Sequence, residues 1–133
     1  MPAITGIHHL SLTVLDAAKS EAFYTSVLGF APVFERPDED GRGFKRILAH
    51  PDTRTIIGFT VHKTNDGSRF SEFRTGLDHL AFGVASHEEL EGWIGKLDEF
   101  GVEHSPITDA KVGEFVSFRD PDNVQIELWA NPA

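Results

Sequence analysis

Two stretches of the chain, "GIHHLSLTV" at residues 6–14 and "GLDHLAFGV" at residues 76–84, align without a gap. The alignment places His9 opposite His79, whereas His8 falls on Asp78. It also superposes Gly6 on Gly76, Leu10 on Leu80 and Val14 on Val84. Both stretches are rich in residues that favour extended backbone, so each predicts a strand. The chain is therefore expected to contain an internal repeat.

Later stretches extend this repeat. "HPD" (50–52) mirrors "DPD" (120–122), and "IIGF" (56–59) mirrors "QIEL" (125–128). The first half predicts strands at 6–14, 30–35, 44–49 and 55–62, with a helix that Asp16 caps and Gly29 ends. The second half predicts strands at 76–84, 113–119 and 124–130. It also predicts a helix that Ser86 and Glu89 cap and that ends near Gly101. The apolar stripe of this helix consists of Leu90, Trp93, Ile94 and Leu97.

Each half thus predicts a strand, a helix and then about three strands, an α+β arrangement. We expect one domain over 1–133, with a first module at 4–62, a linker or lid at 63–75 and a second module at 76–131. In such a half the helix covers one apolar sheet face, and the other face needs a further partner. Two halves side by side are therefore predicted to enclose a cavity.

The composition limits the classes of function. The formal charge of -9 argues against nucleic acid or an anionic membrane as a partner. Cysteine is absent, which excludes disulfides and cysteine chemistry. No basic segment leads into an apolar one at the N-terminus, and no apolar run reaches membrane-spanning length. A cytoplasmic location is therefore expected.

Strand parity predicts which side chains line the cavity, because neighbours in a strand point to opposite faces. The rows expected under the helices are Leu10, Leu12 and Val14, then Leu80, Phe82 and Val84, and finally Val124, Ile126 and Leu128. The opposite rows are His9, Ser11 and Thr13, then His79, Ala81 and Gly83, and finally Gln125, Glu127 and Trp129. His8 shares the parity of the helix-packed row, so His9 and not His8 is expected to face the cavity.

Two imidazoles and one carboxylate, from His9, His79 and Glu127, suit a divalent ion such as Fe(II), Mn(II) or Zn(II). A lone strand histidine is more often a core or surface residue, and that interpretation is preferred for His8, His50, His87 and His104. His62 continues the parity of Gly58 and could border the cavity. Glu127 has the alternative of being an outward-facing surface glutamate, which its apolar neighbours make less attractive.

The chain resembles the vicinal oxygen chelate superfamily, which includes glyoxalase I, bleomycin resistance proteins, extradiol dioxygenases and fosfomycin-modifying transferases. The resemblance rests on "HHLSLTVLD", "EAFYTSVLGF", "GLDHLAFGV" and "FRDPDNVQIEL". It implies paired βαβββ modules around a central metal-binding cavity, with metal ligands at His9, His79 and Glu127. It also implies that Tyr24, within a structural signature, serves packing.

The chain departs from individual branches of that family. Glyoxalase I adds a fourth ligand, a glutamate, where "TIIGFTV" places Gly58 or a neighbouring isoleucine. Fosfomycin transferases carry basic residues in a C-terminal extension, whereas this chain stops six residues after Glu127. Extradiol dioxygenases add an acid–base histidine, for which His62 is a candidate, and a tyrosine, for which Tyr24 looks misplaced. Bleomycin-binding relatives generally lack the metal ligands.

The sequence therefore predicts a metal-dependent enzyme acting on a small molecule with vicinal oxygens, with a dioxygenase-type oxidoreductase using Fe(II) as the first choice. The alternatives are a lyase, isomerase or transferase using Mn(II) or Zn(II), and a non-catalytic drug- or metabolite-binding protein. A homodimer is expected. Whether the modules pair within one chain or exchange between chains stays open.

Two loops, at 37–44 and 66–76, have the glycines, charges and aromatics of mobile covers over a pocket, and ordinary surface loops are the alternative. In this hypothesis Phe70 and Phe73 cap an apolar part of the site, and Arg46 or Arg69 meets an anionic substrate group. The predicted pocket residues are Ser11, Thr13, Arg46, Gly58, Phe70, Phe73 and Trp129.

Overall fold

The chain forms two compact units, residues 1–68 and 69–133, which we call module 1 and module 2. The computed structural model describes residues 1–37 and 43–132. Each module contains one helix and one four-stranded sheet, so the predicted α+β class with two βαβββ modules is confirmed. Most of the loop predicted at 37–44 lies outside the described residues.

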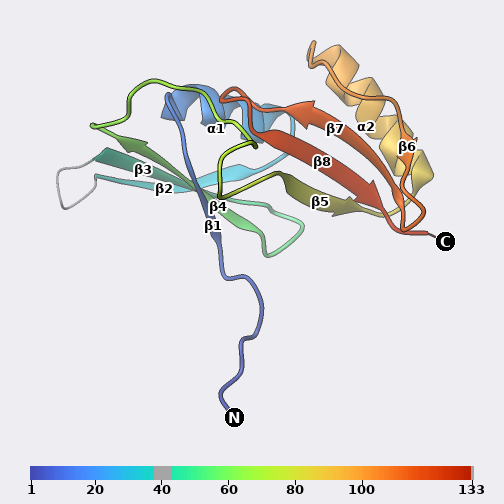
Figure 1. Ribbon diagram of the computed structural model, residues 1–133, viewed down its shortest axis with the longest axis horizontal. Coiled ribbons are helices and arrows are strands. Elements are labelled where there is room, and N and C mark those ends of the chain that lie inside the picture. Colours follow the sequence, from blue (N-terminus) through green and yellow to red (C-terminus); the bar gives the residue numbers. More distant parts are fainter. Residues whose placement is uncertain (38–42, 133) are drawn as a thin grey trace. The chain divides into compact units, whose positions relative to one another are not determined.

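Module 1 consists of β1 (Leu10–Thr13), α1 (Ala17–Ser26), β2 (Ala31–Pro37), β3 (Gly43–Ala49) and β4 (Ile56–His62) (Figure 1). The strand order is β1-β4-β3-β2, with β1 parallel to β4 and the other pairs antiparallel. Asp16 caps α1 as predicted, because its carboxylate accepts from the backbone N–H groups of Ala18 and Lys19. This cap turns the chain back over the sheet directly after β1.

The core of module 1 lies between α1 and its sheet. Leu12 and Val14 are buried there, whereas Ser11 and Thr13 are exposed, as the alternation predicts. Tyr24 is fully buried, and its ring centroid lies 5.0 Å from that of Phe59 on β4. Its place in the core fits the packing role that the resemblance implies.

Module 2 consists of β5 (Leu80–Val84), α2 (His87–Glu99), β6 (Thr108–Asp109), β7 (Glu114–Arg119) and β8 (Gln125–Ala130). The order β5-β8-β7-β6, with β5 parallel to β8, repeats the topology of module 1. Ser86 caps α2 by accepting from the N–H of Glu89. Leu90 and Leu97 of α2 are fully buried, as the helical stripe predicts.

The mirrored turns before the last strand of each module use different side chains for the same bond. Asp120 accepts from the N–H of Asp122 at 2.9 Å, and His50 accepts through Nδ1 from the N–H of Asp52 at 3.2 Å. His50 therefore has a structural role in a turn, as expected. No helix among the described residues has the length and apolar character needed to cross a bilayer.

The second part of the predicted linker is bonded to module 2. The N–H of Phe70 donates to the carbonyl of Asp122 at 3.0 Å, and the Asn123 side chain donates to the carbonyl of Phe70 at 3.1 Å. Arg119 forms two hydrogen bonds of 3.1 Å with the carboxylate of Glu72, which lower the pKa of that carboxyl. Phe70 is thus attached to the turn between β7 and β8, and Glu72 to the last residue of β7.

Candidate metal-binding site

The strand registers identify equivalent positions in the two modules. Ser11 of β1 is paired with Gly58 of β4, and Ala81 of β5 is paired with Glu127 of β8. Since Ser11 and Ala81 are equivalent in the sequence repeat, Gly58 takes the place that Glu127 has in module 2. The register thus selects Gly58 over its isoleucine neighbours.

Glu127 is a buried carboxylate with hydrogen-bond partners on both oxygens. It is 5 % exposed. Gln125 Nε2 donates to its Oε2 at 2.6 Å, and Trp129 Nε1 donates to its Oε1 at 2.8 Å. These contacts place the three side chains side by side on one face of β8, as parity predicts. A surface glutamate would not be buried in this way.

His79 is directed at the same carboxylate. Its Nε2 lies 3.4 Å from Glu127 Oε1, and its Nδ1 lies 2.7 Å from Asp78 Oδ1. An ionised carboxylate only accepts, so His79 Nδ1 carries the hydrogen in that contact. In the neutral ring Nε2 then has a free lone pair, the arrangement common for metal-bound histidines. The donors of His79 and Glu127 therefore fit a divalent ion.

His9 has a different neighbour. Its Nδ1 lies 2.9 Å from Nδ1 of His8, and both rings are exposed. The expectation that these neighbours point to opposite faces is wrong, because β1 begins only at Leu10 and strand parity does not reach residues 8 and 9. Over residues 1–37 and 43–132, neither module by itself gathers three acidic or histidine side chains that could hold a metal ion.

Three of the predicted pocket residues of module 1, Ser11, Thr13 and Gly58, are small. Ser11 Oγ lies 3.4 Å from Thr60 Oγ1, and Thr13 is exposed. A Cβ atom on Gly58 would lie 3.1 Å from Ile47 Cδ1 and 3.4 Å from Ser11 Oγ. The space beside Gly58 is therefore already filled by these two side chains. His62, at the end of β4, is half-buried.

Arg46 lies on the helix-covered face of module 1. It is paired in register with Phe59, and its guanidinium lies 2.6 Å from Glu21 of α1 and 3.4 Å from Glu35 of β2. Its side chain is 23 % exposed. An anionic substrate group would therefore compete with two carboxylates for Arg46.

The aromatic candidates lie in module 2. Phe70 is half-buried against the β7–β8 turn, whereas Phe73 is 92 % exposed and Arg69 is exposed. Trp129 stacks on its cross-strand partner Phe115, with ring centroids 4.7 Å apart and an interplanar angle of 16°. Trp129 thus touches both the candidate ligand and a supporting ring.

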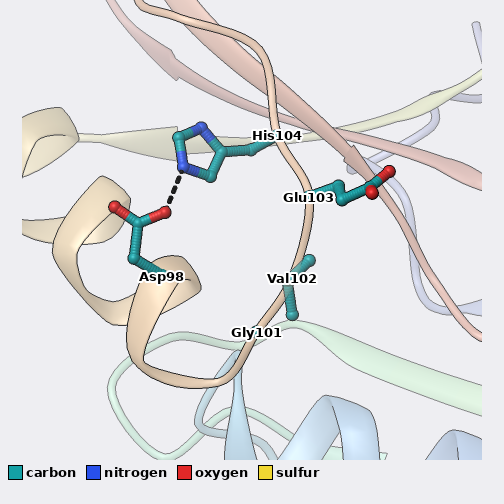
Figure 2. A pocket seen from close by; sticks show the side chains of 5 residues that line it. All are labelled: Asp98, Gly101, Val102, Glu103 and His104. Atoms are coloured by element: carbon teal, nitrogen blue, oxygen red, sulfur yellow. Dashed lines mark hydrogen bonds and ion pairs between the residues drawn. The ribbon is translucent and has the colours of Figure 1, made fainter.

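A separate hollow of about 480 Å³ lies at the end of α2, lined by Asp98, Gly101, Val102, Glu103 and His104 (Figure 2). His104 Nδ1 lies 2.6 Å from the Ser105 carbonyl oxygen, and Nε2 lies 2.8 Å from Asp98 Oδ1. These two acceptors raise the pKa of His104. The ring therefore ties the helix end to the following segment, in line with the structural role expected for it. His87 is likewise engaged, with Glu114 at 3.1 Å.

Two roles were not predicted from the sequence, that of Asp78 beside His79 and that of the Gln125 side chain as a donor. Asp78 could have been found because it precedes the repeated histidine and stands at the position of His8. Parity had already placed Gln125 in the row of Glu127, without a role. Nothing in the pattern, however, gives the direction of a side-chain hydrogen bond.

Comparisons with known proteins agree with this architecture. The family model "Glyoxalase/Bleomycin resistance protein/Dioxygenase superfamily" matches residues 6–128. The uncharacterized protein YwkD of Bacillus subtilis is 34% identical over 95% of this chain and 97% of its own. The putative ring-cleaving dioxygenase MhqA of Bacillus subtilis is 28% identical over 92% of this chain, which spans only 39% of MhqA.

Solved structures show the same fold. A glyoxylase/bleomycin resistance protein/dioxygenase domain from Frankia sp. EAN1pec superposes with a TM-score of 0.89 at 28% identity, covering 98% of this chain and 100% of that one. A mutant of the fosfomycin resistance protein FosX from Listeria monocytogenes, complexed with Mn(II) and 1S,2S-dihydroxypropylphosphonic acid, gives a TM-score of 0.74 at 23% identity. It covers 98% of this chain and 93% of that one. A divalent metal therefore occurs within this fold.

Proposed function

Since the chain belongs to the Glyoxalase/Bleomycin resistance protein/Dioxygenase superfamily, we propose that it is a metal-dependent enzyme acting on a small molecule with two neighbouring oxygen atoms. The observation that carries this proposal is the contact of 3.4 Å between His79 Nε2 and the buried Glu127 Oε1. A nitrogen lone pair and a carboxylate oxygen directed at each other suit a divalent ion.

The third proposed ligand is His9. It holds the position of His79 in the repeat and directly precedes β1, as His79 directly precedes β5. Two histidines and one carboxylate are the ligand set typical of non-haem Fe(II) oxygenases. When bound, the ion supplies Lewis acidity toward the two substrate oxygens.

The remaining proposed roles belong to the protein itself. His62 is the proposed acid–base group, and Gly58 keeps the protein ligands at three because it brings no carboxylate. Ser11, Thr13 and Trp129 are proposed to line the substrate pocket. Phe70 and Phe73 are proposed to cover it, and Arg69 to meet an anionic group of the substrate, since Arg46 lies on the helix-covered face.

Among reaction classes, a dioxygenase-type oxidation with Fe(II) is the first choice. The ligand set supports it, and so does the similarity to MhqA over 92% of this chain. A lyase, isomerase or transferase that uses Mn(II) or Zn(II) for proton transfer or nucleophilic addition is the alternative within the same fold. A drug- or metabolite-binding protein without turnover is the alternative outside catalysis.

The test is anaerobic reconstitution with Fe(II), followed by oxygen uptake with a panel of catechols and hydroquinones. Methylglyoxal–glutathione turnover with Ni(II) and Zn(II) is measured in parallel, and Glu127→Gln serves as the control for both reactions. Oxygen uptake that the variant loses supports the oxidation. Glyoxalase turnover without oxygen uptake overturns the ranking and the argument from Gly58. Protein without affinity for any of these metals favours the binding protein.

The proposed assembly is a homodimer located in the cytoplasm. Light scattering on purified protein tests the oligomeric state, and fractionation of cells expressing the tagged chain tests the location. A monomer at all concentrations would contradict the first proposal, and recovery in a secreted fraction would contradict the second.

A further inference from the structure

The carboxylate of Glu127 is held at both of its oxygens by neutral donors. Gln125 Nε2 binds Oε2 at 2.6 Å, and Trp129 Nε1 binds Oε1 at 2.8 Å. The last torsion of a glutamate side chain is broad and only weakly restricted on its own. Two donors on different oxygens therefore fix a rotation that the side chain itself does not fix.

This rotation selects one oxygen. Oε1 lies 3.4 Å from His79 Nε2, and Gln125 binds the other oxygen. Oε1 also has lone-pair capacity beyond the bond from Trp129, because a carboxylate oxygen can accept more than one bond. The side chains on β8 thus direct Oε1 and not Oε2 at the imidazole.

The indole that donates to Oε1 is itself held in place. Phe115 on β7 is the register partner of Trp129, and the two rings are stacked with centroids 4.7 Å apart. Such stacking restricts the indole to one orientation. The N–H group is therefore aimed at the carboxylate before any ion arrives.

We propose that Trp129 and Gln125 are positioning residues that hold Glu127 with Oε1 directed at the metal ion. The inference rests on the proposed metal-binding function. It changes the role of Trp129 from pocket lining to support of a ligand, and it adds Gln125 to the site. Because both donors act through Glu127, neither needs to touch the substrate.

The experiment uses Trp129→Phe, which keeps a stacking ring but removes the N–H donor, and Gln125→Met, which keeps the side-chain length without the amide. Trp93→Phe on α2 is the matched control, because it removes the other tryptophan of the chain. Mn(II) affinity is measured from the free-ion signal in electron paramagnetic resonance. We expect each positioning variant to weaken binding by about 10- to 100-fold and the control to bind like the wild type.

A second measurement needs no metal. In the Trp93→Phe background, a single indole N–H resonance reports on Trp129 in nitrogen-resolved NMR. Replacing Glu127 by Leu removes the acceptor and should move this resonance upfield, whereas Glu127→Gln keeps an acceptor and should move it less. An unchanged resonance in Glu127→Leu overturns the inference.

The outcomes separate the two proposals. Wild-type protein that binds Mn(II) no better than Trp129→Phe and Gln125→Met overturns the positioning roles and leaves the metal site standing. Wild-type protein that binds neither Mn(II), Fe(II) nor Zn(II) overturns the proposed function, and the positioning roles with it. Weakened binding in both variants, together with the shifted resonance, supports the inference.

Discussion

Module 1 and module 2 share one topology but carry different residues at the equivalent positions 58 and 127. Where β8 carries Glu127 with two hydrogen-bond donors, β4 carries Gly58 beside Ser11 and Ile47. The backbone ladder is the same in both, with Ser11 paired to Gly58 as Ala81 is paired to Glu127. The scaffold therefore tolerates either a buried charge or no side chain at this position.

The two repeated histidines also differ in their support. His79 Nδ1 contacts the carboxylate of Asp78 at 2.7 Å, whereas His9 Nδ1 contacts the imidazole of His8 at 2.9 Å. A hydrogen bond to a charged acceptor is stronger than one between neutral groups. The imidazole of His79 in module 2 is therefore held in its orientation more strongly than the imidazole of His9 in module 1.

Removing the proposed ligands tests most directly whether both modules contribute to metal binding. Glu127→Gln and His9→Ala should each weaken Mn(II) binding by more than about 100-fold, beyond the range typical of outer-shell partners. Glu114→Gln on β7 is the control, and isothermal titration calorimetry is the measurement. Full affinity in His9→Ala would mean that module 1 contributes no ligand.

Removing the neighbour of each histidine should have different effects on Mn(II) affinity in the same assay. Asp78→Ala should weaken Mn(II) binding about tenfold, because the charge-assisted bond that orients His79 is lost. His8→Ala should leave binding nearly intact, since it removes only an exposed imidazole beside His9. Loss of the metal in His8→Ala with retention in Asp78→Ala would reverse the comparison.

The glycine in module 1 can be tested by stability. A Cβ on residue 58 would lie 3.1 Å from Ile47 Cδ1, the end of a flexible side chain that has to shift only slightly, so Gly58→Ala should lower the free energy of unfolding by no more than about 1 kcal/mol. Ile47→Val removes that methyl group and should recover part of the loss in the double variant. Urea unfolding of the wild type, both single variants and the double variant measures the coupling. Additive effects would rule out this contact.

A pH-dependent contact at the end of α2 should give the smallest effect. The Ser105 carbonyl and Asp98 raise the folded-state pKa of His104, so its contribution to stability is present below the unfolded pKa of about 6.5 and is lost as the pH rises through the raised value. Asp98→Asn should therefore lower Tm by roughly 1–4 °C at acidic pH and less at pH 9. Calorimetry at both pH values measures it, and equal shifts would contradict the charge-based origin.

The fold could be predicted because burial alternates along the strands. Leu12 and Val14 are buried, whereas Ser11 and Thr13 are exposed, so the alternation of apolar and polar residues in the sequence matches the burial. The repeat added the second module, and the observed registers match its alignment. The start of each first strand could not be predicted, because Leu10 and Leu80 are the first residues with a partner on the neighbouring strand. The two-residue strand β6 is too short to show any periodicity.

The candidate site could be predicted only as far as parity reaches. Parity grouped Glu127 with Gln125 and Trp129, but the bonds between them depend on rotamers that the sequence does not state. It failed for His8 and His9 because those residues precede the strand. The alignment of "IIGF" with "QIEL" already places Gly58 opposite Glu127, and the strand registers agree with it.

The hydrogen bonds to Glu127 bear on how the protein would behave in a cell that is short of the proposed metal ion. Many small metalloproteins unfold without their ion because the site itself supplies the folding energy. Here the buried charge of Glu127 already has two partners within its own strand, so absence of the proposed ion would not leave this carboxylate unsatisfied. Without the ion, the protein would then stay folded and able to bind it again, and it would not be degraded as an unfolded chain.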